Sequence, residues 1–486
     1  MIILGTNSIK DTGYDVANSL RFNSGSSDYL NRTPSSAGNL RTMTFSFWMK
    51  RSKLTSGAQR IFSIFNNSGA DQFWLRTADS SNDYIDFFSQ TSSTQTLRLV
   101  SSARLRDVSA WYHIVIAVDT TQGTDSNRIK MYINGVQQTS FSTTSYPSQN
   151  TDLEWNKAIP NMLGAQQSNG TAEFIDMYLA EVCFIDGQQL APTSFGEFDE
   201  DSGIWKPKNV SGLTFGTNGF YLEFKESGTS QNSSGLGADT SGQDNHFAVN
   251  NLTAVDQSTD TCTNNFCTMN SLATGSNITL SEGNLVTTGN TASDSGLSTI
   301  TIPFAFSGKW YWEAKIVDGN LNSNSGYPIY GIFDDWESVV DADLNGASGG
   351  ALAMDVSLRF GAGAGQTLIK PGTDLSITAP ADDDIIMFAI DKDNGKFYMG
   401  NNGTWYNSGD PTTGATGTGS LMDLTANKIT MFGIHEYNGS DSSVNFGSPA
   451  FAISSGNTDA EGFGNFEFAV PSGYFALCTK NLAEYG

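Results

Sequence analysis

The sequence predicts an all-β protein of 486 residues that folds into two antiparallel β-sandwich domains. Short apolar or alternating runs recur along the chain, as in RIFSIF, YIDFFSQ and KWYWEAKI, and almost none shows the 3.6-residue period of a helix. Between the runs lie 50 glycines and many serines, threonines and asparagines, which are typical of turns. One strand-and-turn pattern also occurs twice, which indicates two domains of related architecture.

The repeated pattern occupies residues 111–138 and 385–406. The first copy, WYHIVIAVDTTQGTDSNRIKMYINGVQQ, contains a β-branched apolar run, a polar turn, the run RIKMYI and Asn134-Gly135. The second copy, IIMFAIDKDNGKFYMGNNGTWY, repeats this order and also ends near an Asn-Gly pair. Because Asn-Gly tolerates the positive φ angles of a type I′ turn, each copy is predicted to be strand, turn, strand, hairpin and strand.

The chain divides into four segments. Residues 1–16 begin with MIIL and continue with a polar run, and we expect them to dock against another subunit. Residues 17–205 and 272–486 are each the size of a sandwich domain. Residues 206–271 contain a long stretch rich in Ser, Gly, Asn and Thr, so they are predicted to be a polar connector between the domains.

The charge balance excludes some classes of partner. The chain has 50 acidic and 26 basic residues, which gives a net charge of −24 and a pI near 4.3. Its surface potential repels nucleic acid and anionic membrane surfaces, and no basic cluster offsets it. No run of 18 apolar residues is present, and the start of the chain lacks the basic flank of a signal peptide. We therefore expect no nucleic-acid partner, no membrane insertion and no secretion signal.

Several blocks of the sequence resemble known families. TMTFSFWMKR, AWYHIVIAVD with RIKMYINGVQQ, and EFIDMYLAEVCFIDGQQLAPTSFGEF resemble successive strands of the laminin-G-like or concanavalin-like jelly-roll family. SGKWYWEAKI, YGIFDDW, DIIMFAIDKDNGKFYMGNNGTW and KITMFGIHEYNGSDSSVNFGSPAF resemble the SPRY family, which is also a two-sheet sandwich. The segments SGQDNHFAVNNLTAVDQSTDTCTNN and FAVPSGYFALCTKNL resemble segments of marine tailed-phage virion proteins that pair these two domains.

The resemblance implies two antiparallel jelly-roll sandwiches in a non-enzymatic virion structural protein. Such a fibre or appendage protein is assembled in the host cytoplasm, is exposed on the particle exterior and contacts other virion proteins through its N-terminal segment. Fibre-like phage proteins are commonly homotrimers, and they present binding domains to host-surface glycans. Two alternatives remain: a glycan depolymerase on the concanavalin-like fold, and a monomeric capsid decoration protein.

The residues themselves indicate no catalytic centre. His113 lies in a predicted strand, and no nucleophile motif such as G-x-S-x-G accompanies it, so a structural role is predicted. A glycosidase needs two carboxylates that face one cleft. In EFIDMYLAE, the odd offsets place Glu173 and Glu181 on the strand face opposite Asp176, which speaks against an acid–nucleophile pair on this strand.

Metal and cofactor sites are also weakly indicated. The loop that starts at Asp391, DKDNGKFYMGNN, has its glycine one position too early for a calcium loop, so it is predicted to be a hairpin turn. No cofactor is predicted, although laminin-G-like domains can hold a rim calcium ion and acidic clusters occur at FDDW, ADDDI and EFDEDSG. The cysteines are too few for a disulfide scaffold and are expected to be structural or free thiols: Cys183, Cys262, Cys267 and Cys478.

Aromatic residues in loops are the best candidates for ligand contacts, because sugars and protein partners pack on their faces. Trp336 lies beside Asp334 and Asp335 in FDDWESVV, and Trp405 and Tyr406 follow an Asn-Gly turn. These five residues are the predicted ligand-binding candidates. The alternative is that the aromatic rings belong to the core, where such residues are often buried.

Overall fold

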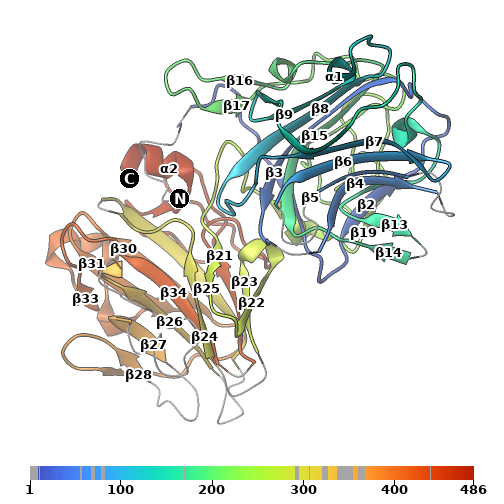
Figure 1. The fold of residues 1–486 in the computed structure, drawn as a ribbon. Coiled ribbons are helices and arrows are strands. Elements are labelled where there is room, and N and C mark those ends of the chain that lie inside the picture. Colours follow the sequence, from blue (N-terminus) through green and yellow to red (C-terminus); the bar gives the residue numbers. More distant parts are fainter. Residues whose placement is uncertain are drawn as a thin grey trace. The chain divides into compact units, whose positions relative to one another are not determined.

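The computed structural model describes residues 9–486, apart from residues 10, 55–56, 67–71, 78–82, 169, 291–294, 306, 320–326, 337–353, 360–366 and 438. Most of the regular elements of the described residues are β-strands, and the α-helices among them are short: α1 (Asp125–Arg128) and α2 (Thr479–Tyr485) (Figure 1). They form two compact units, one of Asp11–Thr263 and one that contains Asn264–Gly486. The all-β prediction is confirmed.

The first unit is a sandwich of two antiparallel sheets, named here the β3 sheet and the β6 sheet. The β3 sheet has the order β10 (Val136–Gln138), β9 (Ile129–Ile133), β8 (Trp111–Asp119), β3 (Thr42–Arg51), β15 (Met177–Asp186), β1 (Ser19–Phe22) and β20 (Gln257–Ser258), and β18 (Phe220–Leu222) also pairs with β15. The β6 sheet has the order β11 (Phe141–Ser145), β7 (Thr94–Ser101), β6 (Ile85–Thr91), β5 (Gln72–Thr77), β4 (Gln59–Phe65), β12 (Asn161–Leu163), β2 (Tyr29–Arg32) and β19 (Ala248–Asn250). Two hairpins complete the unit: β13 (Gln166–Ser168) with β14 (Gly170–Ala172), and β16 (Gly196–Phe198) with β17 (Trp205–Pro207).

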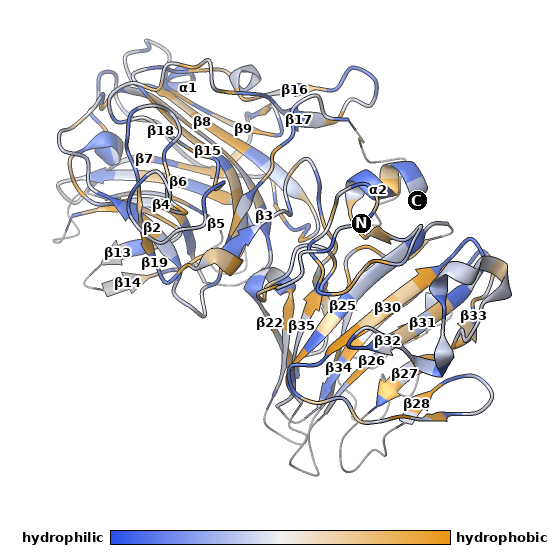
Figure 2. Cartoon of the chain, turned by 180° about the vertical axis from the view of Figure 1, so that it is seen from behind, coloured by the Kyte–Doolittle hydropathy of each residue, from blue (hydrophilic) through white to orange (hydrophobic). Residues whose placement is uncertain are grey.

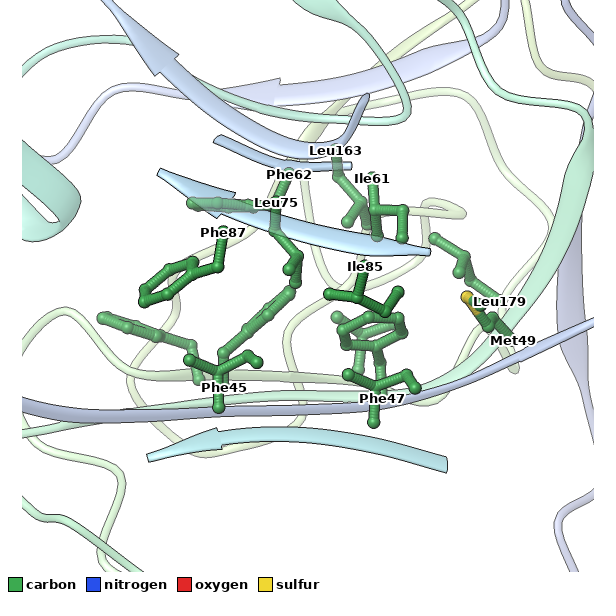
Figure 3. Packing of buried hydrophobic residues seen from close by; sticks show 14 of the residues in the cluster. Phe45, Phe47, Met49, Ile61, Phe62, Leu75, Ile85, Phe87, Leu163 and Leu179 are labelled. Atoms are coloured by element: carbon green, nitrogen blue, oxygen red, sulfur yellow. The ribbon is translucent and has the colours of Figure 1, made fainter. Parts of the chain in front are cut away.

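The core of this sandwich lies between the two sheets. Phe45 and Phe47 of β3 point toward Phe62 and Phe87 of the β6 sheet (Figure 3). Trp155, in the short 3-10 helix η2 (Glu154–Asn156), joins them, with its ring centroid 5.3 Å from that of Phe87. Because successive side chains of a strand alternate between its faces, every second residue of TMTFSFWMKR enters this layer.

The second unit is also a sandwich, formed by the β34 sheet and the β25 sheet. The β34 sheet has the order β21 (Met269–Thr274), β24 (Ser295–Ile300), β34 (Met431–Tyr437), β26 (Tyr327–Phe333), β27 (Val356–Arg359), β28 (Thr367–Ile369) and β29 (Leu375–Ser376). The β25 sheet has the order β22 (Ile278–Ser281), β23 (Val286–Gly289), β35 (Asp441–Asn445), β25 (Lys309–Asp318), β30 (Ile385–Asp391), β31 (Lys396–Asn401) and β32 (Thr404–Trp405), with β33 (Met422–Asp423) on β31 and β36 (Phe475–Ala476) on β25. Figure 2 shows hydrophobic residues concentrated on strands such as β30 and hydrophilic residues in many loops.

The C-terminal segment covers the outer face of the β25 sheet. Phe466 and Tyr474 pack with Tyr311 of β25 in a second apolar layer outside the main core. Glu313, buried on the same strand, accepts hydrogen bonds from the backbone N–H groups of Glu467 (3.0 Å) and Phe468 (2.8 Å). The segment is therefore held by a buried carboxylate as well as by apolar packing.

The repeated sequence pattern forms the same hairpin structure in both sandwiches. Asn134 and Gly135 both have positive φ, as do Asn402 and Gly403, so both pairs form the predicted hairpin turns. In the first copy, the side-chain oxygen of Asn134 accepts the backbone N–H of His113 (2.7 Å), and its own N–H donates to the carbonyl of that residue (2.9 Å). Asn402 makes the same two bonds with the first residue of β30, at 2.9 and 3.0 Å. Each asparagine thus bonds its hairpin turn to the strand that pairs with the first strand of the hairpin: β8 in the first copy and β30 in the second.

The predicted connector, residues 206–271, is wrong for residues 206–263. This stretch supplies β18, β19 and β20 to the two sheets of the first sandwich. Its apolar residues enter the core of that sandwich: Phe220, Leu222 and Phe224, which alternate in the run GFYLEF, and the more isolated Leu236, Phe247 and Leu252. The unit boundary falls between Thr263 and Asn264. The composition suggested a connector because, after GFYLEF, the stretch is polar and its isolated apolar residues form no period-2 run.

The N-terminal segment, residues 1–16, is described in part. Residues 1–8 and residue 10 lie outside the described residues, so the docking prediction stays a prediction for them. Val16 packs beside Trp48 and Trp111 on the outer side of the β3 sheet. Tyr14 donates from its hydroxyl to the Glu181 carboxylate (3.1 Å). In residues 11–16, Thr12 and Val16 are buried and Tyr14 is half-buried, whereas residues 11, 13 and 15 are exposed, so docking stays a prediction for this part as well.

Candidate functional site

The outer face of the β6 sheet carries two rows of polar and aromatic side chains. Directly paired residues of antiparallel strands share a face, so the pairing places Ser63, Trp74, Phe88 and Arg98 in one row across β4, β5, β6 and β7. The neighbouring row contains Arg60, Arg76 and Asp86. We call Arg60, Trp74, Arg76, Asp86, Phe88 and Arg98 the arginine–aromatic face.

Trp74 is held between two neighbours. Its ring stacks on Phe88 with the centroids 3.7 Å apart and the planes at 8°. The guanidinium carbon of Arg60 lies 4.0 Å from the centroid of the Trp74 ring. Arg60 is on β4 and Phe88 on β6, on either side of β5, so they cover opposite faces of the indole. The row is therefore a rigid stack, stabilised by aromatic and cation–π contacts.

Two carboxylates orient the arginines of this face. Asp86, fully buried, accepts from Arg76 Nη2 (2.9 Å) and from Arg98 Nη2 (3.1 Å). Glu173 accepts from Arg60 Nε. Within the described residues, Arg60 Nη1 and Nη2 and Arg98 Nη1 donate to no protein group. Together with Glu173, the face thus carries three positive and two negative side chains. The Arg98 side chain is 31% exposed and that of Arg60 is 6% exposed, so Arg98 offers the more accessible N–H group for a ligand.

These residues were not predicted from the sequence, because aromatic ligand contacts were expected in loops. The signal was present in the strands. In QFWLRT, Trp74 and Arg76 are two positions apart, and in IDFFSQT the same holds for Asp86 and Phe88. Charged residues at alternate positions of an apolar strand indicate a face outside the core. The register that brings the strands together could not be derived from the local sequence.

His113 is a structural residue, as its position in a strand predicted. It lies on the outer side of the β3 sheet, with its ring stacked near Trp48 and Trp205. The Trp205 indole N–H donates to Nδ1 (3.0 Å), so Nε2 carries the proton and donates to Ser46 Oγ (2.8 Å). Burial lowers the pKa of His113 to about 3, which keeps it neutral at physiological pH.

The three carboxylates of EFIDMYLAE lie in three different environments. Glu173 pairs with Arg60 on the outer side of the β6 sheet. Asp176 accepts from the N–H (2.9 Å) and hydroxyl (2.8 Å) of Ser24. Glu181 is buried at a β-bulge, with a φ of 52° and a register shift in the pairing of β15 with β3. Each carboxylate is engaged in a separate interaction within the fold.

Replacing Glu181 by glutamine is expected to change how stability depends on pH. Burial raises the pKa of Glu181 to about 7 from 4.5, and the Tyr221 hydroxyl donates to it at 2.5 Å. Between these pH values the folded state binds a proton that the unfolded state has released, so stability falls as the pH rises. In Glu181→Gln this fall is smaller by about 3 kcal/mol.

Urea unfolding of both proteins at about pH 4.5 and about pH 8 measures the difference. Glutamine is the matched replacement, because it keeps the side-chain length and an oxygen that accepts from the tyrosines. Equal pH dependence in the two proteins would contradict the role assigned to Glu181.

Asp334, Asp335 and Trp336, the first group of predicted ligand contacts, follow β26 in a turn. Asp334 is buried, and its Oδ2 accepts the backbone N–H of Thr425 (2.7 Å). Asp335 pairs with Lys428 (2.9 Å). Trp336 is half-buried and packs against the core of the second sandwich. All three therefore have clear structural partners.

Trp405 and Tyr406, the second group, are also partly packed. Trp405 is half-buried and lies edge-on to Tyr311 (6.5 Å between ring centroids) and to Tyr398 (6.4 Å). Tyr406 packs against the main core, and burial raises the pKa of its hydroxyl. The Trp405 ring thus belongs to the apolar layer outside the β25 sheet, and the Tyr406 ring packs against the main core.

The structure places the two predicted groups at opposite ends of β30. The first residue of this strand bonds to Asn402, in the turn before Trp405. Lys392, directly after the strand, donates from Nζ to the carbonyl of Lys428, whose own Nζ pairs with Asp335. The five candidates thus do not form one site, and ligand binding by either group stays a prediction.

The described residues contain no group of side chains that could be assigned as a metal site. Among them, no three His, Cys, Asp or Glu side chains are placed so that they could hold a metal ion. Carboxylates of the acidic clusters bond locally, as Asp384 does with Asn401 (3.0 Å) and Asn402 (2.6 Å). All four cysteines are free thiols. No helix in the described part of the chain has the length and apolar character needed to cross a membrane.

Comparison with known families finds a match within the first sandwich. Residues 24–188 match the family described as the concanavalin A-like lectin/glucanases superfamily. The laminin-G-like or concanavalin-like part of the predicted resemblance is therefore confirmed for this region. The matched residues include the whole arginine–aromatic face. No curated protein sequence matches the chain.

Solved structures with similar folds include laminin-G, pentraxin and SPRY domains. Domains LG4-5 of the mouse laminin alpha1 chain are 11% identical, and the match covers 97% of this chain and 89% of that one, with a TM-score of 0.29. The SPRY domain of human HERC1 is 16% identical over 36% of this chain and 96% of that one, with a TM-score of 0.26. A heptameric SAP-like pentraxin from Limulus polyphemus is 15% identical over 37% of this chain and 80% of that one, with a TM-score of 0.28.

Proposed function

We propose that this chain is a non-enzymatic glycan-binding protein and that the arginine–aromatic face of its first sandwich holds the glycan. The observation that carries this proposal is the rigid row on the outer face of the β6 sheet, with guanidinium N–H groups that no protein atom accepts within the described part of the chain. The family match over residues 24–188 supports it, because that family includes lectins. Ordered donors on a rigid sheet lose little entropy when they bind a ligand.

The geometry of the nearby carboxylates supports a binding role over hydrolysis. A glycosidase requires an acid and a nucleophile or base that flank one bond. Glu173 is paired with Arg60, Asp176 is bound by Ser24, and Glu181 lies on the other sheet. The intact protein is therefore expected to release no reducing sugar from the polysaccharides that it binds.

Binding of the full-length chain to a glycan array tests the proposal. We expect Arg98→Ala to weaken binding about tenfold or more, because a charge-assisted hydrogen bond is lost. Arg41→Ala is the matched control, since Arg41 is an exposed arginine paired with Asp152 and lies outside the face. Trp336→Ala tests the other sandwich. Loss of binding in Trp336→Ala with normal binding in Arg98→Ala would refute the location of the site.

The resemblance to tailed-phage proteins supports a finer proposal, a fibre or appendage protein on the exterior of a virion. Contacts with other virion proteins are then proposed for residues 1–16, in which Tyr14 and Val16 also pack on their own sandwich. Several weak glycan sites gain avidity in a symmetric oligomer, so a homotrimer is proposed. Light scattering that shows a monomer, together with solitary copies on the particle, would favour a capsid decoration protein.

A further inference from the structure

We infer that the ligand of the arginine–aromatic face is an acidic oligosaccharide whose carboxylates bind Arg60 and Arg98. This inference rests on the proposed glycan-binding function and adds the chemical class of the glycan. It depends on three features of the face: covered aromatic rings, the hydrogen-bond donors that remain, and the spacing of the two arginines.

The covered rings argue against a neutral sugar. Neutral sugars bind proteins in large part by packing their apolar faces on open aromatic rings. Both faces of the Trp74 ring are occupied, by Arg60 and by Phe88, and Phe88 itself is 6% exposed. The face therefore offers no open aromatic platform, although it contains two large rings.

The remaining donors suit a carboxylate. Glu173 binds Arg60 through Nε, which leaves the Nη1 and Nη2 pair as a planar fork. Asp86 binds Arg98 through Nε and Nη2, which leaves Nη1. A guanidinium fork matches the two oxygens of a planar carboxylate in a bidentate pair. Both arginines are already oriented by their acidic partners, so little side-chain entropy is lost when a ligand binds.

The spacing of the arginines indicates an oligosaccharide. Arg60 is on β4 and Arg98 on β7, with Trp74 and Phe88 on the two strands between them. Three strand spacings amount to about 14 Å. This is the separation of the strand backbones; the guanidinium groups lie closer together, because Arg60 leans over Trp74 and Arg98 leans onto Asp86. The stacked Trp74 and Phe88 rings lie on the strands between them, so the two arginines would contact carboxylates on different sugar residues.

The negative net charge of the chain limits the charge density of an acidic ligand that can bind. Three arginines against Asp86 and Glu173 give the face a local excess of one positive charge. The whole chain has a net charge of −24. A densely charged polyanion is repelled strongly by the rest of the surface, whereas a ligand with spaced carboxylates carries fewer charges and is repelled less.

Titration calorimetry with the full-length protein tests the inference. The probes are short oligomers of galacturonate, mannuronate–guluronate and sialic acid, each beside its neutral methyl ester, and a sulfated galactan oligomer. We expect at least one carboxylated oligomer to bind tenfold or more tightly than its ester and than the sulfated probe. Arg60→Gln and Arg98→Gln should each weaken that binding about tenfold, and Arg41→Gln should leave it unchanged.

The outcomes separate this inference from the proposed function. Equal binding of the acids and their esters would overturn the inference while glycan binding stands. Stronger binding of the sulfated probe would also overturn it, in favour of a sulfate ligand. Binding of no saccharide at all would remove both proposals. Arg98→Lys guards against misfolding, because it keeps the charge beside Asp86 but loses the planar fork; it should weaken binding with an unchanged melting temperature.

Discussion

Replacement of Trp155 by alanine is expected to lower the unfolding free energy of the first sandwich by about 3–5 kcal/mol, because the change removes a large ring from a packed core. Trp155 is 1% exposed and lies between the sheets. Its ring centroid is 5.3 Å from that of Phe87 and 5.8 Å from those of Phe45 and Phe184. These rings cannot close the space that the indole leaves without shifting two sheets.

Urea unfolding of the full-length chain, fitted with separate transitions for the two units, measures this loss. Val136→Ala is the control, since Val136 is 56% exposed on the edge strand β10, and its expected change is within about 0.5 kcal/mol. A loss below about 1 kcal/mol in Trp155→Ala would show that the indole is not a central part of this core.

Replacement of Asp86 by alanine is expected to cost about 3–5 kcal/mol, because it leaves two arginines without their buried counter-charge. Asp86 is fully buried and pairs with Arg76 and Arg98, whose side chains are 10% and 31% exposed. The carboxylate also fixes the direction of Arg98, so glycan binding should weaken together with stability.

Asp152→Ala is the matched control for Asp86→Ala. Asp152 pairs with Arg41, and both side chains are about half exposed, so this pair contributes about 1 kcal/mol or less. The same unfolding experiment compares the two variants. If both variants lose the same small amount, the buried network does not stabilise the arginine–aromatic face.

The sequence predicts those parts of the fold that depend on local chemistry. Asn134-Gly135 and Asn402-Gly403 form the expected turns because positive φ is a property of the residues themselves. The strands of both sandwiches were predicted from short apolar runs, because these runs are also a property of the local sequence. Residues 206–263 were misassigned because much of their packing depends on single apolar residues, such as Leu236 and Phe247, that are recognised as core residues only once the rest of the core is known.

The candidate site depends on how the strands pair with one another, and this pairing could not be derived from the sequence. The alternation in QFWLRT and IDFFSQT puts Trp74 with Arg76 and Asp86 with Phe88, but it does not show that Arg60 would cover one face of the indole. The parity argument for EFIDMYLAE also has a physical limit. A β-bulge at Glu181 shifts the register, so counting offsets along the strand no longer gives the face of a side chain.

A crystal structure of the full-length protein with the saccharide that binds most tightly tests the central claim most directly. The account predicts that the sugar lies on the outer face of the β6 sheet, with its acidic groups within hydrogen-bond distance of Arg60 Nη1 or Nη2 and of Arg98 Nη1. A saccharide bound instead near Trp336, or near Trp405 and Tyr406, with the arginine–aromatic face unchanged, would contradict it.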